Sequence, residues 1–446
     1  MPTVSDISNP TTLSGQAHID ALLEPYAVRW NYQTVNPPNT IYYSFSLAGY
    51  TPPSENEYVP GELSEVSDIQ QDGIRLAVEY VASVTGIEFL ETGSAAVADI
   101  HFANADIGED FAGYAWWQSW YRHEGETLTG YMADGVVYMD NARYEEYNAV
   151  PLPGGFAYEL VLHELGHILG LKHPFDGDIL LPDHLDSTDH TLMSYTSHAG
   201  AYSVFSEYDL AALKWLYGGD GLGGNFGLGT PGRYVAGTAA NDTLAGGDGN
   251  DKLEGEAGHD KLDGGAGFDI VLYAGARADH AITRTAQGYT VSGPGGTDTV
   301  VNAERIDFAD TMVALDSDGA GGQAYRLYQA AFDRKPDTIG LGYWIDAMDK
   351  GLGLRDVAAH FIASEEFASL YGGARPDNAV FVDRLYANIL HRAPEQGGYA
   401  YWTGVLAQGA DRAEVLAAFS ESGENREAVA KLIGNGFDYT AWVTEM

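Results

Sequence analysis

Four units of nine residues follow one another without a break, at residues 237–272, and constrain the fold more than any other feature of this sequence. Each unit opens with glycine, carries aspartate at its sixth position and has an aliphatic residue at its eighth. Glycine tolerates the positive φ of tight turns, and strict phase predicts stacked structural repeats. The aspartate carboxylates can bind Ca²⁺ together with backbone carbonyls. They belong to Asp242, Asp251, Asp260 and Asp269.

These units resemble the RTX calcium-binding nonapeptide repeat. The resemblance implies a parallel β-roll domain over residues 218–320, with an aliphatic stack inside it: Leu244, Leu253, Leu262 and Val271. In the first unit Thr238 and Ala240 replace glycines, so we expect an irregular cap there. Without calcium, repulsion between the aspartates is expected to keep the segment poorly folded. The alternative is a flexible linker of glycine and aspartate, which the strict phase disfavours.

A histidine motif, HELGHILGLKHP, lies upstream of the repeats at residues 163–174. On a helix, His163 and His167 share one face and can ligate one zinc ion. Glu164 would stand beside that metal, where a carboxylate can act as general base on a zinc-bound water. Gly170 lets the chain leave the helix sharply, which can bring His173 back as a third ligand. The alternative is an amphipathic core helix with chance histidines, which the complete motif disfavours.

A second motif, TLMSY at residues 191–195, follows the third histidine. Together the two motifs resemble those of the metzincin zinc proteases, and most closely the serralysin branch. By that resemblance Met193 lies beneath the zinc as a hydrophobic floor. Tyr195 would be an additional, labile zinc ligand that swings away and hydrogen-bonds the transition-state oxyanion. The alternative for Tyr195 is a turn tyrosine packed on the core.

Composition narrows the classes of function and partner. The 446 residues carry a formal net charge of −41 and include no cysteine. This charge offers no basic footprint for nucleic acid. The missing cysteine excludes disulfides, thiol catalysis and cysteine-ligated zinc. The aspartates of the repeats indicate calcium binding, whereas the remaining carboxylates are explained by solubility.

The fold class expected from these features is a multidomain α/β + β + α chain. Residues 1–217 would form the metzincin-type catalytic domain. Within them we expect strands at about 41–46, 87–91, 99–103 and 135–140 and helices at 64–84, 156–170 and 206–217. A glycine-rich linker would follow at 218–232. In serralysins the region of Gly113–Trp117 is an edge strand that pairs with an extended substrate, and an ordinary buried strand is the alternative.

The segments around the repeats bear on localisation. Residues 302–316 resemble the β segment that follows such repeats in proteins exported by type I secretion, which use an uncleaved C-terminal signal. The N-terminus shows no conventional signal-peptide pattern, and no apolar run reaches the length of a membrane span. We therefore expect a secreted, extracellular protein that uses the type I secretion machinery and is not transmembrane. Residues 1–14 are a candidate short pro-segment.

The last part of the chain, residues 321–446, contains an internal duplication with an offset of 58 residues. Tyr343-Trp344 recurs as Tyr401-Trp402, and Phe361 recurs as Phe419. Helical periodicity predicts two related helical units in a small bundle. The repeated aromatic pairs are candidates for contact with a glycan or cell surface, although core packing is the more common use.

The resulting hypothesis is a secreted zinc endopeptidase that is folded and stabilised by calcium and acts on protein or peptide substrates. His163, His167, His173 and Tyr195 would ligate zinc, and Glu164 and Tyr195 would be the catalytic side chains. The rival hypotheses are a surface-attached binding protein that retains a protease fold, and a protease that its helical tail localises or restrains.

Overall fold

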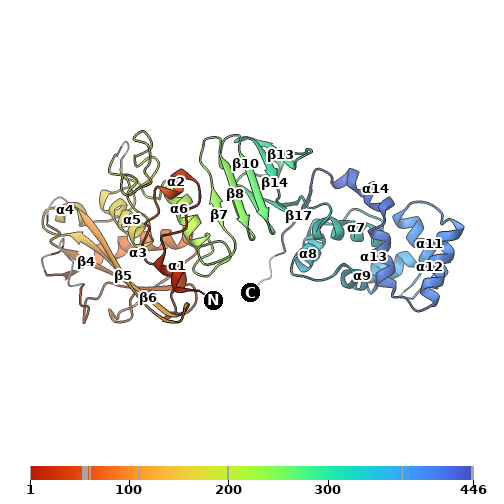
Figure 1. The fold of residues 1–446 in the computed structure, drawn as a ribbon, viewed down its shortest axis with the longest axis horizontal. Coiled ribbons are helices and arrows are strands. Elements are labelled where there is room, and N and C mark those ends of the chain that lie inside the picture. Colours follow the sequence, from red (N-terminus) through yellow and green to blue (C-terminus); the bar gives the residue numbers. More distant parts are fainter. Residues whose placement is uncertain are drawn as a thin grey trace. The chain divides into compact units, whose positions relative to one another are not determined.

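The computed structural model describes residues 2–52, 59, 62–108, 111–197, 200–373 and 375–442. The chain divides into two compact units, residues 1–256 and 257–446, and mixes helices and strands (Figure 1). The division falls inside the third nonapeptide, so each unit carries part of the repeats. In the described part of the chain, no helix combines the length and apolarity needed to cross a membrane.

The first unit is built on a sheet with the strand order β3-β1-β4-β6-β5. Its strands are β1 (Thr40–Ser44), β3 (Glu88–Glu91), β4 (Ile100–Ala105), β5 (Gly113–Glu124) and β6 (Thr127–Asp140). The pairs β1–β3, β1–β4 and β4–β6 are parallel, whereas β5 runs antiparallel to β6. Strand β5 is therefore an edge strand, as expected for the region of Gly113–Trp117. A short strand, β2 (Ser64–Glu65), pairs antiparallel with β4.

Three longer helices accompany this sheet: α3 (Asp68–Thr85), α5 (Phe156–Ile168) and α6 (Glu207–Tyr217). Helix α3 begins four residues later than expected, because Ser67 caps it and its hydroxyl accepts a hydrogen bond from the Gln70 N–H. Helix α5 packs against β5 and α3. Trp30 is fully buried and donates from Nε1 to the Ile168 carbonyl, which ties the N-terminal part to the end of α5. Short helical segments complete the unit: α1 (Val4–Ser8), α2 (Ala17–Asp20), η1 (Trp30–Tyr32) and α4 (Glu145–Asn148).

The nonapeptides form short strands joined by tight turns. In the first unit of the chain these are β8 (Thr243–Asp248) and β9 (Lys252–Glu254), which follow β7 (Tyr234–Ala236), and in the second unit they are β10 (Lys261–Ala266) and β11 (Ile270–Tyr273). Strands β7 and β9 pair in parallel. The four aliphatic side chains predicted to lie inside the roll are buried, as expected. Each is at most 1% exposed: Leu244, Leu253, Leu262 and Val271.

The first nonapeptide differs from the other three in its turn. The three later nonapeptides have positive φ at their second and fourth positions: Gly247 and Gly249, Glu256 and Gly258, and Gly265 and Gly267. Neither Thr238 nor Ala240 has a positive φ. Instead the Asp242 carboxylate accepts hydrogen bonds from the backbone N–H and the hydroxyl of Thr238, at 2.7 and 2.9 Å. The replacement of glycine therefore changes the turn, as predicted for an irregular cap.

In the second unit the strands after the repeats extend the β structure. Strands β12 (Ala281–Arg284), β13 (Tyr289–Gly293) and β14 (Gly296–Val301) form an antiparallel meander, and β14 pairs in parallel with β10. Strand β15 (Arg305–Phe308) pairs in parallel with β11 and antiparallel with β16 (Met312–Ala314). Residues 302–316 thus supply two strands.

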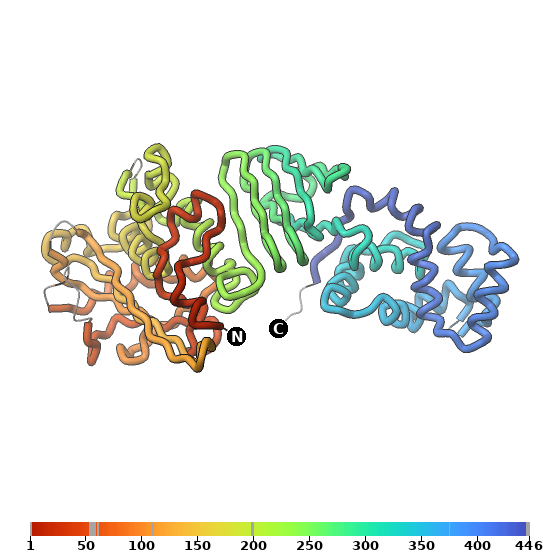
Figure 2. Tube along the Cα trace, in the orientation of Figure 1, coloured from red at the N-terminus to blue at the C-terminus, as the bar shows by residue number. Residues whose placement is uncertain are grey.

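The C-terminal region consists of helices and one returning strand. The helices are α7 (Ala320–Phe332), α8 (Thr338–Asp349), α9 (Leu354–Ile362), α10 (Glu365–Tyr371), α11 (Asn378–Ile389), α12 (Gln396–Ala407), α13 (Arg412–Ser420) and α14 (Gly423–Ile433). The chain then returns as β17 (Phe437–Tyr439) and pairs antiparallel with β16, a path that can be followed in Figure 2. Along the chain, these helices therefore lie between two strands that pair with each other. The sequence did not indicate this pairing.

The duplication is visible in matching side-chain contacts. Arg334 pairs with Glu366 at 2.7 Å, and Arg392 pairs with Glu424 at 2.8 Å. Trp344 packs on Phe361 and Trp402 packs on Phe419, with ring centroids 5.2 and 5.1 Å apart. The two tryptophans pack against the core, which is the more common use of aromatic pairs. Tyr343 and Tyr401 are exposed.

Candidate metal centre and cleft

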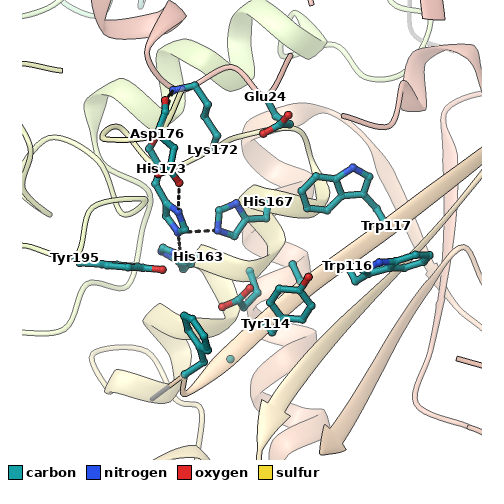
Figure 3. A pocket seen from close by; sticks show the side chains of 14 residues that line it. Glu24, Tyr114, Trp116, Trp117, His163, His167, Lys172, His173, Asp176 and Tyr195 are labelled. Carbon is teal, nitrogen blue, oxygen red and sulfur yellow. Dashed lines mark hydrogen bonds and ion pairs between the residues drawn. The ribbon is translucent and has the colours of Figure 1, made fainter. Parts of the chain in front are cut away.

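Helix α5 and the turn after it bring the three motif histidines together. His163 and His167 lie one helical turn apart on α5. Gly170 has a φ of 101°, which reverses the chain and returns His173 to the same place. The Nε2 atom of His173 lies 3.1 Å from that of His167 and 3.3 Å from that of His163. Figure 3 shows the three rings converging on one point at the wall of the cleft.

The opposite ring nitrogens have oxygen partners. Nδ1 of His163 lies 2.7 Å from the Leu192 carbonyl, and Nδ1 of His167 lies 3.0 Å from the Leu171 carbonyl. Nδ1 of His173 lies 2.9 Å from the Asp176 carboxylate. A carbonyl or carboxylate can only accept, so each Nδ1 is assigned as the protonated nitrogen and each Nε2 as the one with the free lone pair. Three lone pairs at such short separations repel one another unless a cation lies between them, so the residues fit a metal ion.

The electrostatic setting favours the neutral imidazoles that ligate metals. Burial lowers the pKa of His163 to about 4, with a further contribution from His173. Burial also lowers the pKa of His167 well below its ordinary value and lowers that of His173. In the described chain these histidines form the one group of three or more His, Asp or Glu side chains that could hold a metal ion together.

Glu164 lies on the same helix and faces the cleft. Its side chain is 5% exposed, and burial raises the pKa of its carboxyl to about 8, while the Ala115 N–H opposes that shift. The site also depends on Gly113, because a Cβ there would lie 2.9 Å from Glu164 Oε1. The first residue of β5 thus leaves room for the carboxylate, which is placed to exchange a proton with a group in the cleft.

The TLMSY segment packs beneath and beside the histidines. Met193 is fully buried, and its Sδ would lie 2.7 Å from a Cβ at Gly166, so the glycine within HELGH accommodates the methionine. The Tyr195 ring centroid is 4.7 Å from that of His173, and the residue is 62% exposed, so it faces the cleft rather than the core. Met193 thus lies below the histidines and Tyr195 beside them, and their roles at a zinc ion stay predictions.

Three supporting residues were not identified from the sequence. Asp209 is fully buried in α6 and accepts hydrogen bonds from Thr191 Oγ1 and the Leu192 N–H, which fixes the segment that holds His163. Lys172 Nζ donates to the carbonyls of Asp176 and Ile179, which secures the loop after His173. Asp176 orients His173. The Ser206–Asp209 capping box was readable as a helix start, but no local pattern marked the other two residues.

A cleft with a volume of about 470 Å³ runs between these groups and the edge strand. Tyr114, Trp116 and Trp117 of β5 line one wall, and the histidines, Glu164 and Tyr195 line the other (Figure 3). Strand β5 has a neighbour on one side only, so its outer edge is open to main-chain pairing except at Ala115, whose N–H donates to the Glu164 carboxylate. No residue before Glu24 lines the cleft in the described chain.

The repeat aspartates divide into two kinds. Asp251, Asp260 and Asp269 are at most 2% exposed, whereas Asp242 is partly exposed and caps its own turn. Burial raises the pKa of Asp251 even though the Arg233 N–H donates to its carboxylate at 2.6 Å. A buried carboxylate is costly unless a positive charge compensates it, so these side chains fit a divalent cation.

Comparison with known proteins finds two matching family models and metalloprotease relatives. The RTX calcium-binding nonapeptide repeat family matches residues 236–271, and a domain of unknown function, DUF4214, matches residues 358–429. The chain is 26% identical over 209 residues to the metalloprotease AprA of Pseudomonas entomophila, covering 42% of this chain and 41% of that protein. It is 26% identical over 294 residues to serralysin of Proteus mirabilis, covering 52% and 57%. The chain thus spans about half the length of the curated relatives it matches.

A solved structure, the extracellular lipase LipA of Serratia marcescens, matches 17% of this chain and 14% of its own chain at 23% identity, with a TM-score of 0.11. A score this low supports no structural argument. The sequence matches support the resemblance expected from the motifs: the chain is similar to serralysins and carries RTX repeats.

Proposed function

We propose that this chain, similar to serralysins and equipped with RTX repeats, is a secreted zinc-dependent endopeptidase that calcium folds and stabilises. The observation that carries the proposal is the convergence of three imidazole Nε2 atoms beside the buried Glu164, in a cleft along an open strand edge. His163, His167 and His173 would hold the zinc ion. The expected organisation into a catalytic domain, a β-roll and a helical domain is part of the proposal.

The chemistry divides between the metal and the side chains. A bound zinc ion supplies a Lewis acid that polarises a peptide carbonyl and lowers the pKa of water. Glu164 accepts a proton from the attacking water and delivers it to the leaving amine, a role that its position in the cleft beside the histidines supports. Tyr195, exposed and next to His173, hydrogen-bonds the oxyanion and can add its phenol to the metal ligands in the resting site.

The edge strand supplies substrate binding. An extended peptide would add a strand to β5, with main-chain hydrogen bonds holding the scissile carbonyl opposite Glu164. Such pairing recognises the substrate's main-chain groups and not its side chains, so proteins of many sequences would be substrates. The buried aspartates of the repeats would bind calcium once the chain has left the cell through type I secretion.

Hydrolysis of casein by the zinc- and calcium-loaded protein tests the proposal. Wild-type protein should cleave casein, and Glu164→Ala should lose activity by about 10²-fold to 10⁴-fold, the usual size of a general acid–base contribution, while it retains zinc. Glu146→Ala, an exposed carboxylate on α4, is the matched control and should remain active. A Glu164→Ala variant as active as the control would overturn the mechanism. A folded, loaded wild type that cleaves no protein would overturn the proposed activity.

A further inference from the structure

A second cavity opens beside the catalytic groups and has no assigned role. Its volume is about 550 Å³, and it shares His163, Glu164 and Tyr195 with the cleft. Leu160 of α5 and Leu192 contribute apolar lining. A side chain that entered this cavity would therefore belong to a residue next to the bond under attack.

Besides Glu164, the lining of this cavity holds a second carboxylate, that of Glu159. Glu159 is four residues before His163 on α5, so both side chains lie on the same face of the helix. Its Oε2 accepts a hydrogen bond from the Tyr202 N–H at 2.5 Å, which fixes the carboxylate. The Glu159 side chain is half-buried, and this burial raises the pKa of its carboxyl. Among the described residues that line the cavity there is no lysine or arginine to compensate the carboxylate.

The position of the cavity along β5 indicates which substrate residue it receives. Phe111 and Gly113 line both cavities, but only the cleft extends along β5 to Trp117, and only the second cavity extends back to Ala112. A substrate antiparallel to β5 would have its N-terminal part near Trp117 and its C-terminal part near Gly113. The cavity then lies on the side of the leaving amine, where it receives the residue that follows the scissile bond.

We propose that Glu159 selects a basic side chain, lysine or arginine, at the residue immediately after the scissile bond. The aliphatic stem of such a side chain would pack against Leu160 and Leu192, and its cationic head would reach the fixed carboxylate. An apolar side chain of equal length would fill the cavity but leave Glu159 without a counter-charge. This inference rests on the proposed endopeptidase function.

A peptide library with randomised sequence tests the selection, with cleaved bonds identified by mass spectrometry. Wild type should favour lysine or arginine after the cleaved bond over norleucine by about tenfold, the lower end of what one pocket contact contributes. Glu159→Gln keeps the shape and the acceptor for the Tyr202 N–H, and should lose that preference. Glu24→Gln removes a carboxylate from the cleft but not from this cavity, and should keep it. Cleavage without the preference, or an unchanged preference in Glu159→Gln, overturns the inference and leaves the proposed function intact.

Binding gives a second readout that does not require turnover. Two fluorescent peptides that differ only in arginine or norleucine after the scissile position are titrated into Glu164→Ala and into Glu164→Ala combined with Glu159→Gln. The arginine peptide should bind the first protein about tenfold more tightly than the norleucine peptide, and the second protein without distinction. Equal affinities in the first protein contradict the inference. A clear difference in a protein whose wild type cleaves nothing would support the pocket and overturn the proposed catalysis.

Discussion

The histidine site and the aspartate repeats differ in the charge of the side chains that they offer to a metal ion. At the histidine site the protein supplies neutral ligands, and the Nδ1 atoms lie against oxygens of the Leu192, Leu171 and Asp176 residues. In the repeats it supplies carboxylates that are buried at Asp251, Asp260 and Asp269. A neutral imidazole tolerates burial without a metal far better than an ionised carboxylate does.

Because of this difference, we expect zinc and calcium to control different properties of the protein. The histidine geometry is held by hydrogen bonds and packing, so the loss of zinc should remove activity and leave the surrounding fold. The repeats bury three carboxylates, so the loss of calcium should remove their fold. The buried charge, rather than the number of ligands, sets the dependence of each region on its metal.

The largest expected effect contrasts two aspartates of the repeats. Asp260→Ala should abolish calcium-induced folding of the repeats or raise the calcium midpoint by at least about tenfold, because one buried ligand charge is lost. Asp242→Ala should shift it much less, because Asp242 serves its own turn through Thr238. Circular dichroism during a calcium titration measures both midpoints, and equal shifts would contradict the distinction between the first nonapeptide and the later ones.

A smaller effect is expected at the partner of the third histidine. Asp176→Ala should weaken zinc binding by about 10- to 100-fold, as is usual for the loss of a group that orients a metal-bound histidine. The calcium midpoint should not change. Asp178→Ala, an exposed carboxylate two residues away, is the control. Competition with a zinc chelator gives the affinity, and indistinguishable values for the two variants would remove Asp176 from the metal site.

The smallest effect concerns packing beneath the histidines. Gly166→Ala should lower the free energy of unfolding by about 1–3 kcal/mol, because the new methyl group meets Met193 Sδ. Gly404→Ala in α12 has open space around its new methyl group and should stabilise its helix by about 0.5–1 kcal/mol. Thermal unfolding of the calcium-loaded protein compares the two, and a neutral Gly166→Ala would show that this packing is loose.

Local patterns predicted the parts of the molecule that repeat or that share a helix. The fixed phase of the nonapeptides was sufficient to predict the buried Leu244 and Val271, and the motif spacing was sufficient to predict the meeting of His163 and His173. The later start of α3 escaped prediction because a capping serine overrode the apolar periodicity. The pairing of β17 with β16 joins residues more than a hundred positions apart, and nothing local encodes such a register.

The same limit applies to the supporting residues of the cleft. Asp209 and Glu159 act through contacts with segments that only the fold brings near them, so their positions in the sequence resemble those of ordinary helix carboxylates. The duplication at the C-terminus was readable in sequence, because Tyr343-Trp344 and Phe361 recur at the same offset. In the structure the ion pair of Arg334 and Glu366 recurs as that of Arg392 and Glu424.

Hydrogen exchange on the protein depleted of one metal at a time separates the effect of zinc from that of calcium. Removal of zinc with a zinc-selective chelator should leave α5 and residues 191–195 protected while activity is lost. Removal of calcium alone should expose the amides of residues 246–272. Loss of protection in α5 on removing zinc, or repeats that stay protected without calcium, would contradict the account.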